Sequence, residues 1–83
     1  MDYIKLTERL IKALVIDEDA VSVKEFPSDD ENKVEIQVMV AEDDMKRVIG
    51  KNGKTINSIR TIVQASSSLS EENKRVRINV DSY

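Results

Sequence analysis

Residues 48–60 read VIGKNGKTINSIR, and this stretch decides how the rest of the chain is interpreted. It contains Gly50 and Gly53, the only 2 glycines in 83 residues. Glycine adopts positive φ angles and allows close backbone approach, so two glycines with two residues between them predict a tight turn. Apolar residues at helical spacing stand on both sides of the pair. The turn is therefore expected to join two helices.

Polar residues fill and follow this turn. Lys51 and Asn52 lie between the glycines, and Lys54 comes directly after them. Backbone amides at the positive end of the second helix, together with the two lysines, favour contact with a phosphodiester backbone. The competing interpretation is an ordinary helix–turn–helix connection that needs glycine only for the bend. The glycine spacing alone does not decide between the two.

The segments next to the turn predict two helices and a strand. Before it, a helix of one or two turns begins at Asp43 or Asp44 and ends at Gly50 with a left-handed cap. After it, Ile56, Ile59 and Val63 share one face of a helix over residues 54–67. Apolar residues then alternate with polar ones over residues 76–80, which indicates a final strand.

The first half of the chain predicts a helix followed by a hairpin. Leucines and isoleucines recur at helical spacing over residues 2–16, and Asp2 can cap that helix. Valines alternate with polar residues over 21–24, and apolar residues at every second position over 34–40 predict a second strand. The turn-rich residues 27–32 connect the two. The predicted order is α-β-β-α-α-β, an α+β fold with a three-stranded sheet packed against three helices.

Composition limits the possible classes of protein. A chain of 83 residues with 40% hydrophobic side chains has room for one folded domain, residues 1–83. Histidine and cysteine are absent, which removes the commonest general base, thiolate metal ligands and thiol nucleophiles. We therefore expect no enzyme, no cofactor and no metal. No apolar run approaches the roughly 20 residues that span a bilayer, and the first residues lack a signal-peptide pattern. We expect a cytoplasmic protein.

Charge is segregated along the chain although the net charge is only −3. Residues 1–44 hold five Lys and Arg against thirteen Asp and Glu, whereas residues 45–83 hold eight against three. No acidic residue lies between Met45 and Ser70. A solvated helix face is the simpler explanation of this basic stretch, and a surface for nucleic acid is the other.

The stretch 48–60 resembles the KH signature, an apolar-Ile-Gly-x-x-Gly-x-x-Ile-x-x-Ile pattern, at every defining position. Over nearly the whole chain the sequence is similar, more narrowly, to the bacterial YlqC/KhpA family of small stand-alone KH proteins. The relevant features are the lone N-terminal helix, the strand pair, Ile59-Arg60-Thr61 after the loop and a terminal strand like residues 75–81. The element order is that of the type II KH arrangement.

This resemblance implies that the chain binds single-stranded RNA, with the loop clamping about four nucleotides. Lys51 and Lys54 are then expected to pair with phosphates, and Asn52 to donate to a phosphate or sugar oxygen. Bases lie in a groove between the loop-side isoleucines and the final strand, where polar strand atoms or Arg77 read base edges. The implied RNA-binding residues are Ile49, Gly50, Lys51, Asn52, Gly53, Lys54, Ile56, Arg60 and Arg77.

Several of these assignments have alternatives. For Ile56 and Ile59 core packing is the favoured interpretation and base contact the alternative, whereas Ile49 suits either. Arg60 can reach a phosphate or merely cover the helix face. Gly53-Lys54-Thr55 imitates the end of a nucleotide-binding loop, but that motif requires a glycine where Val48 stands. The carboxylates over residues 29–31 and 42–44 are interpreted as a solvated turn and a helix start because neither has the spacing of a calcium loop.

The alternative function is that of a protein-interaction module. Stand-alone KH proteins of this family resemble subunits of homodimers, or of heterodimers with a larger KH-domain protein. Ile62 lies to one side of the apolar stripe of its helix, so it is the residue expected to make an apolar contact outside the core. A partly buried position against the first helix is the other interpretation of Ile62.

Overall fold

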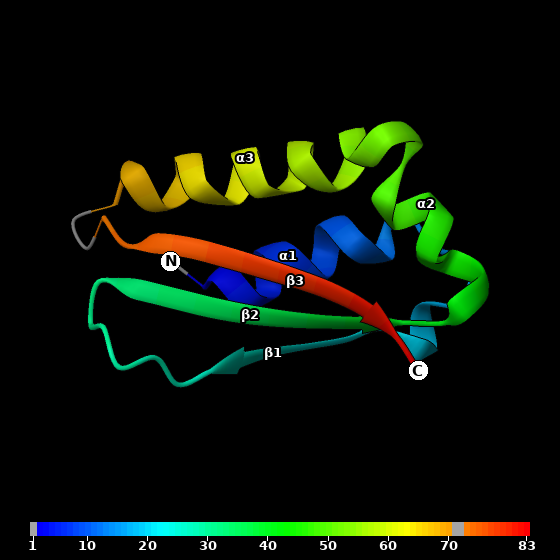
Figure 1. The fold of residues 1–83 in the computed structure, drawn as a ribbon, viewed down its shortest axis with the longest axis horizontal. Helices are drawn as coiled ribbons and strands as arrows, with labels where there is room; N and C mark the ends of the chain where they lie inside the picture. Colours follow the sequence, from blue (N-terminus) through cyan, green and yellow to red (C-terminus); the bar gives the residue numbers. More distant parts are fainter. Residues whose placement is uncertain (1, 71–72) are drawn as a thin grey trace.

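The computed structural model describes residues 2–70 and 73–83 of the chain. The elements follow in the order α1 (Tyr3–Lys12), β1 (Ser22–Phe26), β2 (Lys33–Val40), α2 (Met45–Ile49), α3 (Lys54–Ser68) and β3 (Arg75–Ser82), as Figure 1 shows. Short 3₁₀ turns precede β1, α2 and α3, at Glu18–Ala20, Glu42–Asp44 and Lys51–Gly53. The predicted α-β-β-α-α-β order is confirmed.

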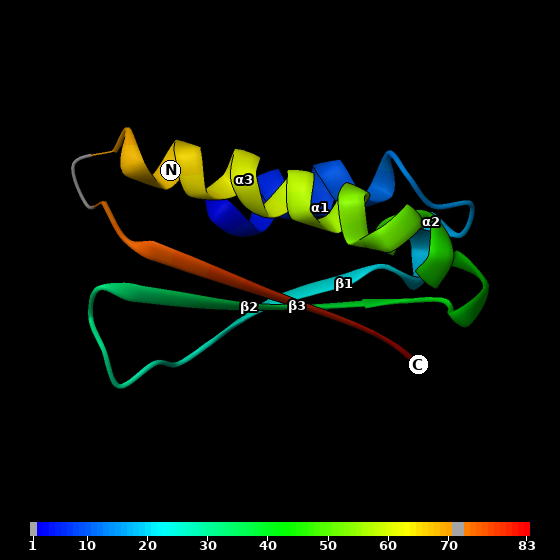
Figure 2. The same cartoon turned by 45° about the horizontal axis from the view of Figure 1, so that its top comes forward.

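The three strands form one mixed sheet in the order β1-β2-β3. β1 is antiparallel to β2, as a hairpin requires, and β3 is parallel to β2. Parallel neighbours need a crossover connection, which α2 and α3 supply. The helices lie together on one face of the sheet, and the opposite face is bare in Figure 2. The sheet therefore has a helix-covered face and an open face.

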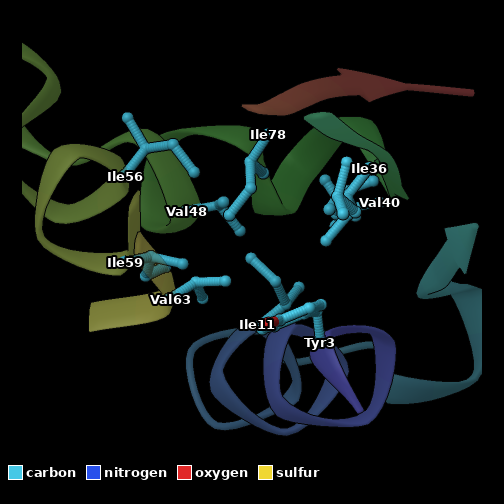
Figure 3. Close-up of a cluster of buried hydrophobic side chains, with 11 residues drawn as sticks. Tyr3, Ile11, Ile36, Val40, Val48, Ile56, Ile59, Val63 and Ile78 are labelled. Atoms are coloured by element: carbon cyan, nitrogen blue, oxygen red, sulfur yellow. The ribbon is translucent and has the colours of Figure 1, made fainter. Parts of the chain in front are cut away.

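The core lies between the helices and the covered face of the sheet. Burial alternates strictly along β2, where Val34, Ile36, Val38 and Val40 are buried and their neighbours are not. Figure 3 shows these strand side chains meeting apolar residues of the three helices, including Ile11 of α1. Burying such a side chain stabilises the fold by about 1.5–3 kcal/mol. The positions that the apolar pattern selected are the ones that hold the layers together.

Helix α1 is shorter than the sequence predicts. Asp2 caps its start as expected, accepting a hydrogen bond from the Lys5 amide at 3.0 Å. The helix ends at Lys12 rather than near Ile16. Leu14 and Val15 still pack against the core, from a segment that is no longer helical. The apolar pattern thus continues past the helix, which is why the predicted end was wrong.

None of the helices within residues 2–70 and 73–83 is long and apolar enough to cross a membrane.

Candidate nucleic-acid interface

The turn between α2 and α3 is made largely of backbone with positive φ. Gly50, Asn52 and Gly53 have φ angles of 76°, 57° and 76°. The Gly53 amide donates a hydrogen bond to the Gly50 carbonyl at 3.2 Å, which closes the turn. Gly50 combines its positive φ with a ψ of 175°, so it is not the left-handed helical cap that the sequence predicts. This extended ψ turns the chain out of α2 before Lys51 begins the next turn.

The loop presents its polar side chains to solvent. Lys51, Asn52 and Lys54 are all exposed. Gly53 caps α3 without any side-chain hydrogen bond, and no acidic residue lies in the first turn of that helix. The amides at the start of α3 therefore donate to no capping side chain, and the first turn of the helix itself contributes no carboxylate. The positive end of the helix dipole and two lysines share this surface, which suits an anion.

A crevice lies between α3 and β3 and is lined by residues of α3 from Arg60 onward and by Arg75 and Val76 of β3. Arg60 bridges it, because Nε and Nη2 donate to the Ile78 carbonyl oxygen at 3.3 and 3.1 Å while Nη1 donates to Asn57 Oδ1 at 3.0 Å. One turn later, Gln64 Oε1 accepts a hydrogen bond from the Val76 amide at 2.9 Å. Arg60 thus lies against the outer edge of the strand. A contact between Arg60 and phosphate stays a prediction.

Arg77 does not face this crevice. Side chains alternate along a strand, and Ile78 is 2% exposed among the core residues on the helix-covered face. Arg77 therefore projects from the open face, next to Glu35, its partner in the register of β2 and β3. The expectation that Arg77 reads bases in the groove beside α3 was wrong in its placement. The alternation of apolar and polar residues in the sequence already indicates that Arg77 and Ile78 project from opposite faces of the strand.

The apolar residues near the loop differ in accessibility. Ile56 and Ile59 are 3% and 4% exposed, which supports their core interpretation. Ile49 is half-buried and packs against the edge of the core. Of the three, Ile49 offers the most surface to a base, while Ile56 and Ile59 are enclosed in the core.

The loop, the two helices that it joins and the mixed sheet together match a known domain. The family model described as the KH domain of KhpA/KhpB matches residues 5–80. The chain belongs to this family.

Three proteins similar to this KhpA/KhpB-family chain are each named RNA-binding protein KhpA. The protein from Halalkalibacterium halodurans is 37% identical over 75 residues, covering 90% of this chain and 93% of the relative. That from Caldanaerobacter subterraneus is 38% identical over 76 residues, covering 92% and 96%. That from Streptococcus pneumoniae is 38% identical over 72 residues, covering 87% and 85%. No solved structure matches the chain significantly.

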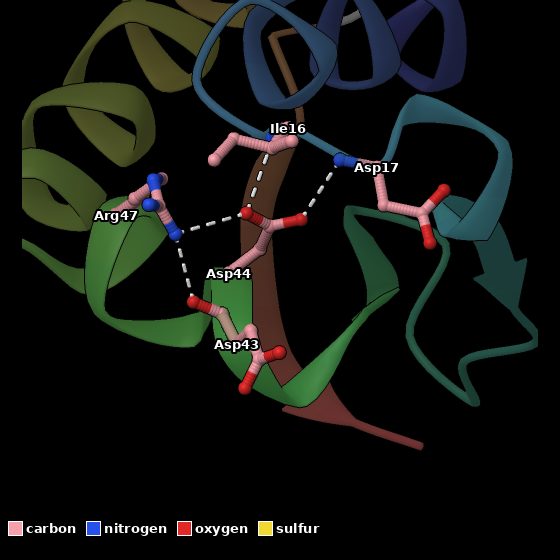
Figure 4. A network of polar contacts seen from close by, with 5 residues as sticks. All are labelled: Ile16, Asp17, Asp43, Asp44 and Arg47. Carbon is pink, nitrogen blue, oxygen red and sulfur yellow. Dashed lines mark hydrogen bonds and ion pairs between the residues drawn. The ribbon is translucent and has the colours of Figure 1, made fainter.

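A buried carboxylate supports the KH helix pair from behind. Asp44 is 2% exposed, and its two oxygens accept hydrogen bonds from the Ile16 amide at 3.1 Å and the Asp17 amide at 3.0 Å. Arg47 Nη1 donates to the same carboxylate at 3.3 Å and to the Asp43 carbonyl at 2.9 Å, as Figure 4 shows. These amides, more than Arg47, hold the pKa of the Asp44 carboxyl below its ordinary value. Asp44 thereby ties the segment after α1 to the start of α2.

Sequence reasoning missed two polar groups of this kind. It placed Asp43 or Asp44 at a helix start, where α2 does begin, but Asp44 makes no capping bond to that helix. Ser67, near the end of α3, is also buried, and its hydroxyl donates to the Lys74 carbonyl. Ser67 follows Val63 by four residues, so helical spacing places it on the buried face although its side chain is polar. Asp44 lies in an acidic run without a period, so its burial could not be predicted from the sequence pattern.

Among residues 2–70 and 73–83, no three or more Asp, Glu, His or Cys side chains gather where they could hold a metal ion.

Proposed function

We propose that this chain binds single-stranded RNA through the GKNG loop, residues 50–53, as a non-catalytic regulator or chaperone of RNA in the cytoplasm. The observation that carries the proposal is the exposed polar turn described above, with two lysines beside an uncapped helix start. The similar proteins from Halalkalibacterium halodurans and Caldanaerobacter subterraneus are named RNA-binding protein KhpA, which supports the same function. The relatives' sequences match most of this chain, including the loop, since the family model spans residues 5–80.

The proposed contacts give affinity rather than sequence discrimination. Lys51 and Lys54 pair with phosphates, and Asn52 together with the first amides of α3 donates to phosphate or sugar oxygens. Bases then pass Ile49 and enter the crevice between α3 and β3. There the outer edge of β3 offers backbone amides and carbonyls for hydrogen bonds to the bases. The Ile78 carbonyl is already occupied by Arg60. A base that donates to this carbonyl must displace the guanidinium of Arg60. Arg60 then either competes with the base for the carbonyl or, once displaced, contacts the RNA itself.

The surface is small, so the affinity of one domain should depend strongly on salt. Three or four neutralised phosphates predict a log–log salt slope of about −2 to −3 for a single strand. Fluorescence anisotropy of a labelled RNA, single-stranded and then annealed to its complement, tests this. We expect salt-sensitive binding of the single strand and weak binding of the duplex, whose bases cannot enter the crevice. Equal binding of both forms would contradict base entry.

A second proposed role is self-association, or association with a larger KH-domain protein, with RNA binding weak or secondary. Ile62 is 47% exposed and Leu69 is 89% exposed. Seven residues separate them, so they lie on one side of α3 and its C-terminal end. Ala65, between them, is also exposed. An apolar stripe of this kind suits packing of α3 against the same helix of a second copy.

A further inference from the structure

The open face of the sheet carries a basic cluster that the proposed clamp does not use. Lys33 of β2 pairs in register with Arg75 of β3, and Glu35 pairs with Arg77. Partners in register project from the same face, and alternation places these four on the face without helices. All but Glu35 are exposed. The cluster thus sets three cations against one carboxylate in a chain whose net charge is −3.

This cluster surrounds a hollow, and within residues 2–70 and 73–83 none of its cations lies within ion-pair distance of a carboxylate. Lys33, Glu35, Arg75, Val76 and Arg77 line a hollow of about 200 Å³. In the part of the chain that the structure describes, the ion pairs are Lys12 with Glu8 and Arg47 with Asp44. Neither involves the hollow. Three cations surround this concave surface, and Glu35 is the one carboxylate that lines it, so an excess of positive charge remains that suits an anion such as a phosphate of RNA.

The hollow adjoins the crevice between α3 and β3, because two residues line both. A second hollow, of about 500 Å³, lies between α3 and β3 and is lined by residues that include Arg60, Gln64, Arg75 and Val76. Arg75 and Val76 line both hollows. Because β3 is an edge strand, no further strand separates the crevice from the open face there. A flexible chain that leaves the crevice at Arg75 can pass over this edge onto the open face.

An aromatic side chain lies farther along the same face. Phe26 of β1 pairs with Glu35, which in turn pairs with Arg77, so the three residues form one row across the sheet. Phe26 is 49% exposed. Exposed aromatic rings stack unpaired bases, and cations beside them hold phosphates, which is the combination that single-stranded nucleic acids use. A row of this kind fits RNA better than it fits an acidic protein.

We infer that single-stranded RNA longer than the loop footprint crosses the edge of β3 at Arg75 and binds a second site on the open face, formed by Lys33, Arg75, Arg77 and Phe26. This inference rests on the proposed RNA binding by the loop. The second site adds phosphate contacts only for strands that are long enough to reach it. The affinity of a monomer for RNA should therefore increase with RNA length. Without the second site, such an increase would require two clamps in a dimer.

The test compares RNAs of about five and about twelve nucleotides by fluorescence anisotropy, at protein concentrations where sedimentation shows a monomer. With two or three further phosphates bound, the native protein should show a salt slope steeper by about 1.4 to 2.1 for the longer RNA. Replacing Arg75→Gln and Arg77→Gln together should remove this increment. The matched control, Lys5→Gln with Arg9→Gln, removes the same charge from exposed positions on α1, away from the open face, and should keep it. Phe26→Leu should weaken binding of the longer RNA with little change in slope.

The outcomes separate this inference from the proposed clamp. If the native protein binds both RNAs and the arginine pair leaves the length increment intact, the open-face site is wrong while the clamp stands. If the arginine pair instead changes the sedimentation coefficient and not the RNA affinities, the cluster binds protein, which also overturns the inference. If the native protein binds neither RNA, the clamp and the second site fail together.

Discussion

Gly50 and Thr55 are packed so closely that a Cβ atom on Gly50 would lie 2.7 Å from Thr55 Cβ and 2.9 Å from the Thr55 amide nitrogen. The other glycine of the loop is different, because a Cβ atom on Gly53 would meet only Asn57 Nδ2, at 3.7 Å. Both residues have a φ of 76°. The two glycines of the motif therefore meet different requirements. Gly50 provides both space and positive φ, whereas Gly53 provides positive φ alone.

Alanine substitutions should separate these requirements. Gly53→Ala adds only the left-handed strain of an L residue, so we expect a loss of about 1–2 kcal/mol in the free energy of unfolding. Gly50→Ala adds a more strained backbone, because positive φ with an extended ψ is essentially restricted to glycine, and an overlap with the Thr55 backbone, so we expect about 3 kcal/mol or more. Urea denaturation of both variants measures the difference. Equal losses would mean that the turn relaxes around Gly50.

Asp44 should make the stability of the protein depend on acid. Its folded pKa lies below the ordinary value of 3.8, mainly because the Ile16 and Asp17 amides donate to the charged form. The unfolded chain therefore takes up this proton at a higher pH than the folded chain. The stabilisation is complete above the unfolded pKa and is lost as the pH falls toward the folded pKa.

Asp44→Asn tests this contribution because the amide keeps the shape and loses the charge. At pH 7 its NH2 group must face a backbone amide, so we expect a Tm lower by on the order of 10 °C. The difference in Tm between native protein and variant should shrink as the pH falls below the ordinary carboxyl pKa. A constant difference from pH 7 to about pH 3 would show that the charge of Asp44 is immaterial.

Thr7 is a weak point in the core. Its side chain is fully buried, and its hydroxyl has no hydrogen-bond partner among the described residues. Thr7→Val replaces this hydroxyl with a methyl group of similar shape and should raise the free energy of unfolding by about 1 kcal/mol. Thr7→Ser keeps the hydroxyl and removes a buried methyl group, so it should lower stability by about 1 kcal/mol. A loss of stability in the valine variant would imply that the hydroxyl is satisfied in solution.

The sequence was a good guide to the layers of this fold for a physical reason. Every second residue of β2 must face the helices, and the buried valines and Ile36 display that period directly. Gly50 and Gly53 likewise revealed a turn that only such residues can make. A single sequence is sufficient to predict structure where buried residues recur with the period of a strand or helix, or where a conformation is open to few residue types, as positive φ is to glycine.

The candidate site was less completely predictable, because its polar contacts depend on how elements pack. Asp44 reaches the amides of Ile16 and Asp17 from a distant part of the chain, and Gln64 binds the edge of β3. No local pattern encodes either contact. Arg77 is a different case, since its alternation with Ile78 placed it opposite the core from the start. Assigning it to the groove overlooked the period of its own strand.

Ile62 provides the test of self-association. Because its side chain is half exposed on α3, Ile62→Glu should leave the circular dichroism spectrum and the Tm nearly unchanged. If α3 forms an interface between copies, the charge should at the same time shift sedimentation toward the monomer. Thr61→Glu, on the neighbouring exposed position, is the matched control and should shift it less. Loss of the folded spectrum in the Ile62 variant would place this residue in the core.

Binding of RNA by the loop, residues 50–53, is tested by one pair of substitutions. Lys51→Asp with Asn52→Asp keeps both glycines and places two carboxylates against the phosphates. Aspartate tolerates the left-handed conformation of Asn52, whose φ is 57°, so the turn should survive. The control, Lys5→Glu with Arg9→Glu, makes a larger change in net charge at exposed positions on α1, outside both proposed RNA sites.

The measurement is fluorescence anisotropy of a labelled random single-stranded RNA with the native protein and both variants, after circular dichroism shows that all three fold alike. We expect salt-sensitive binding of the RNA by the native protein and by the control, and loss of binding in the loop variant. If the native protein does not bind, or the loop variant binds as tightly as the native protein, the loop is not the RNA clamp.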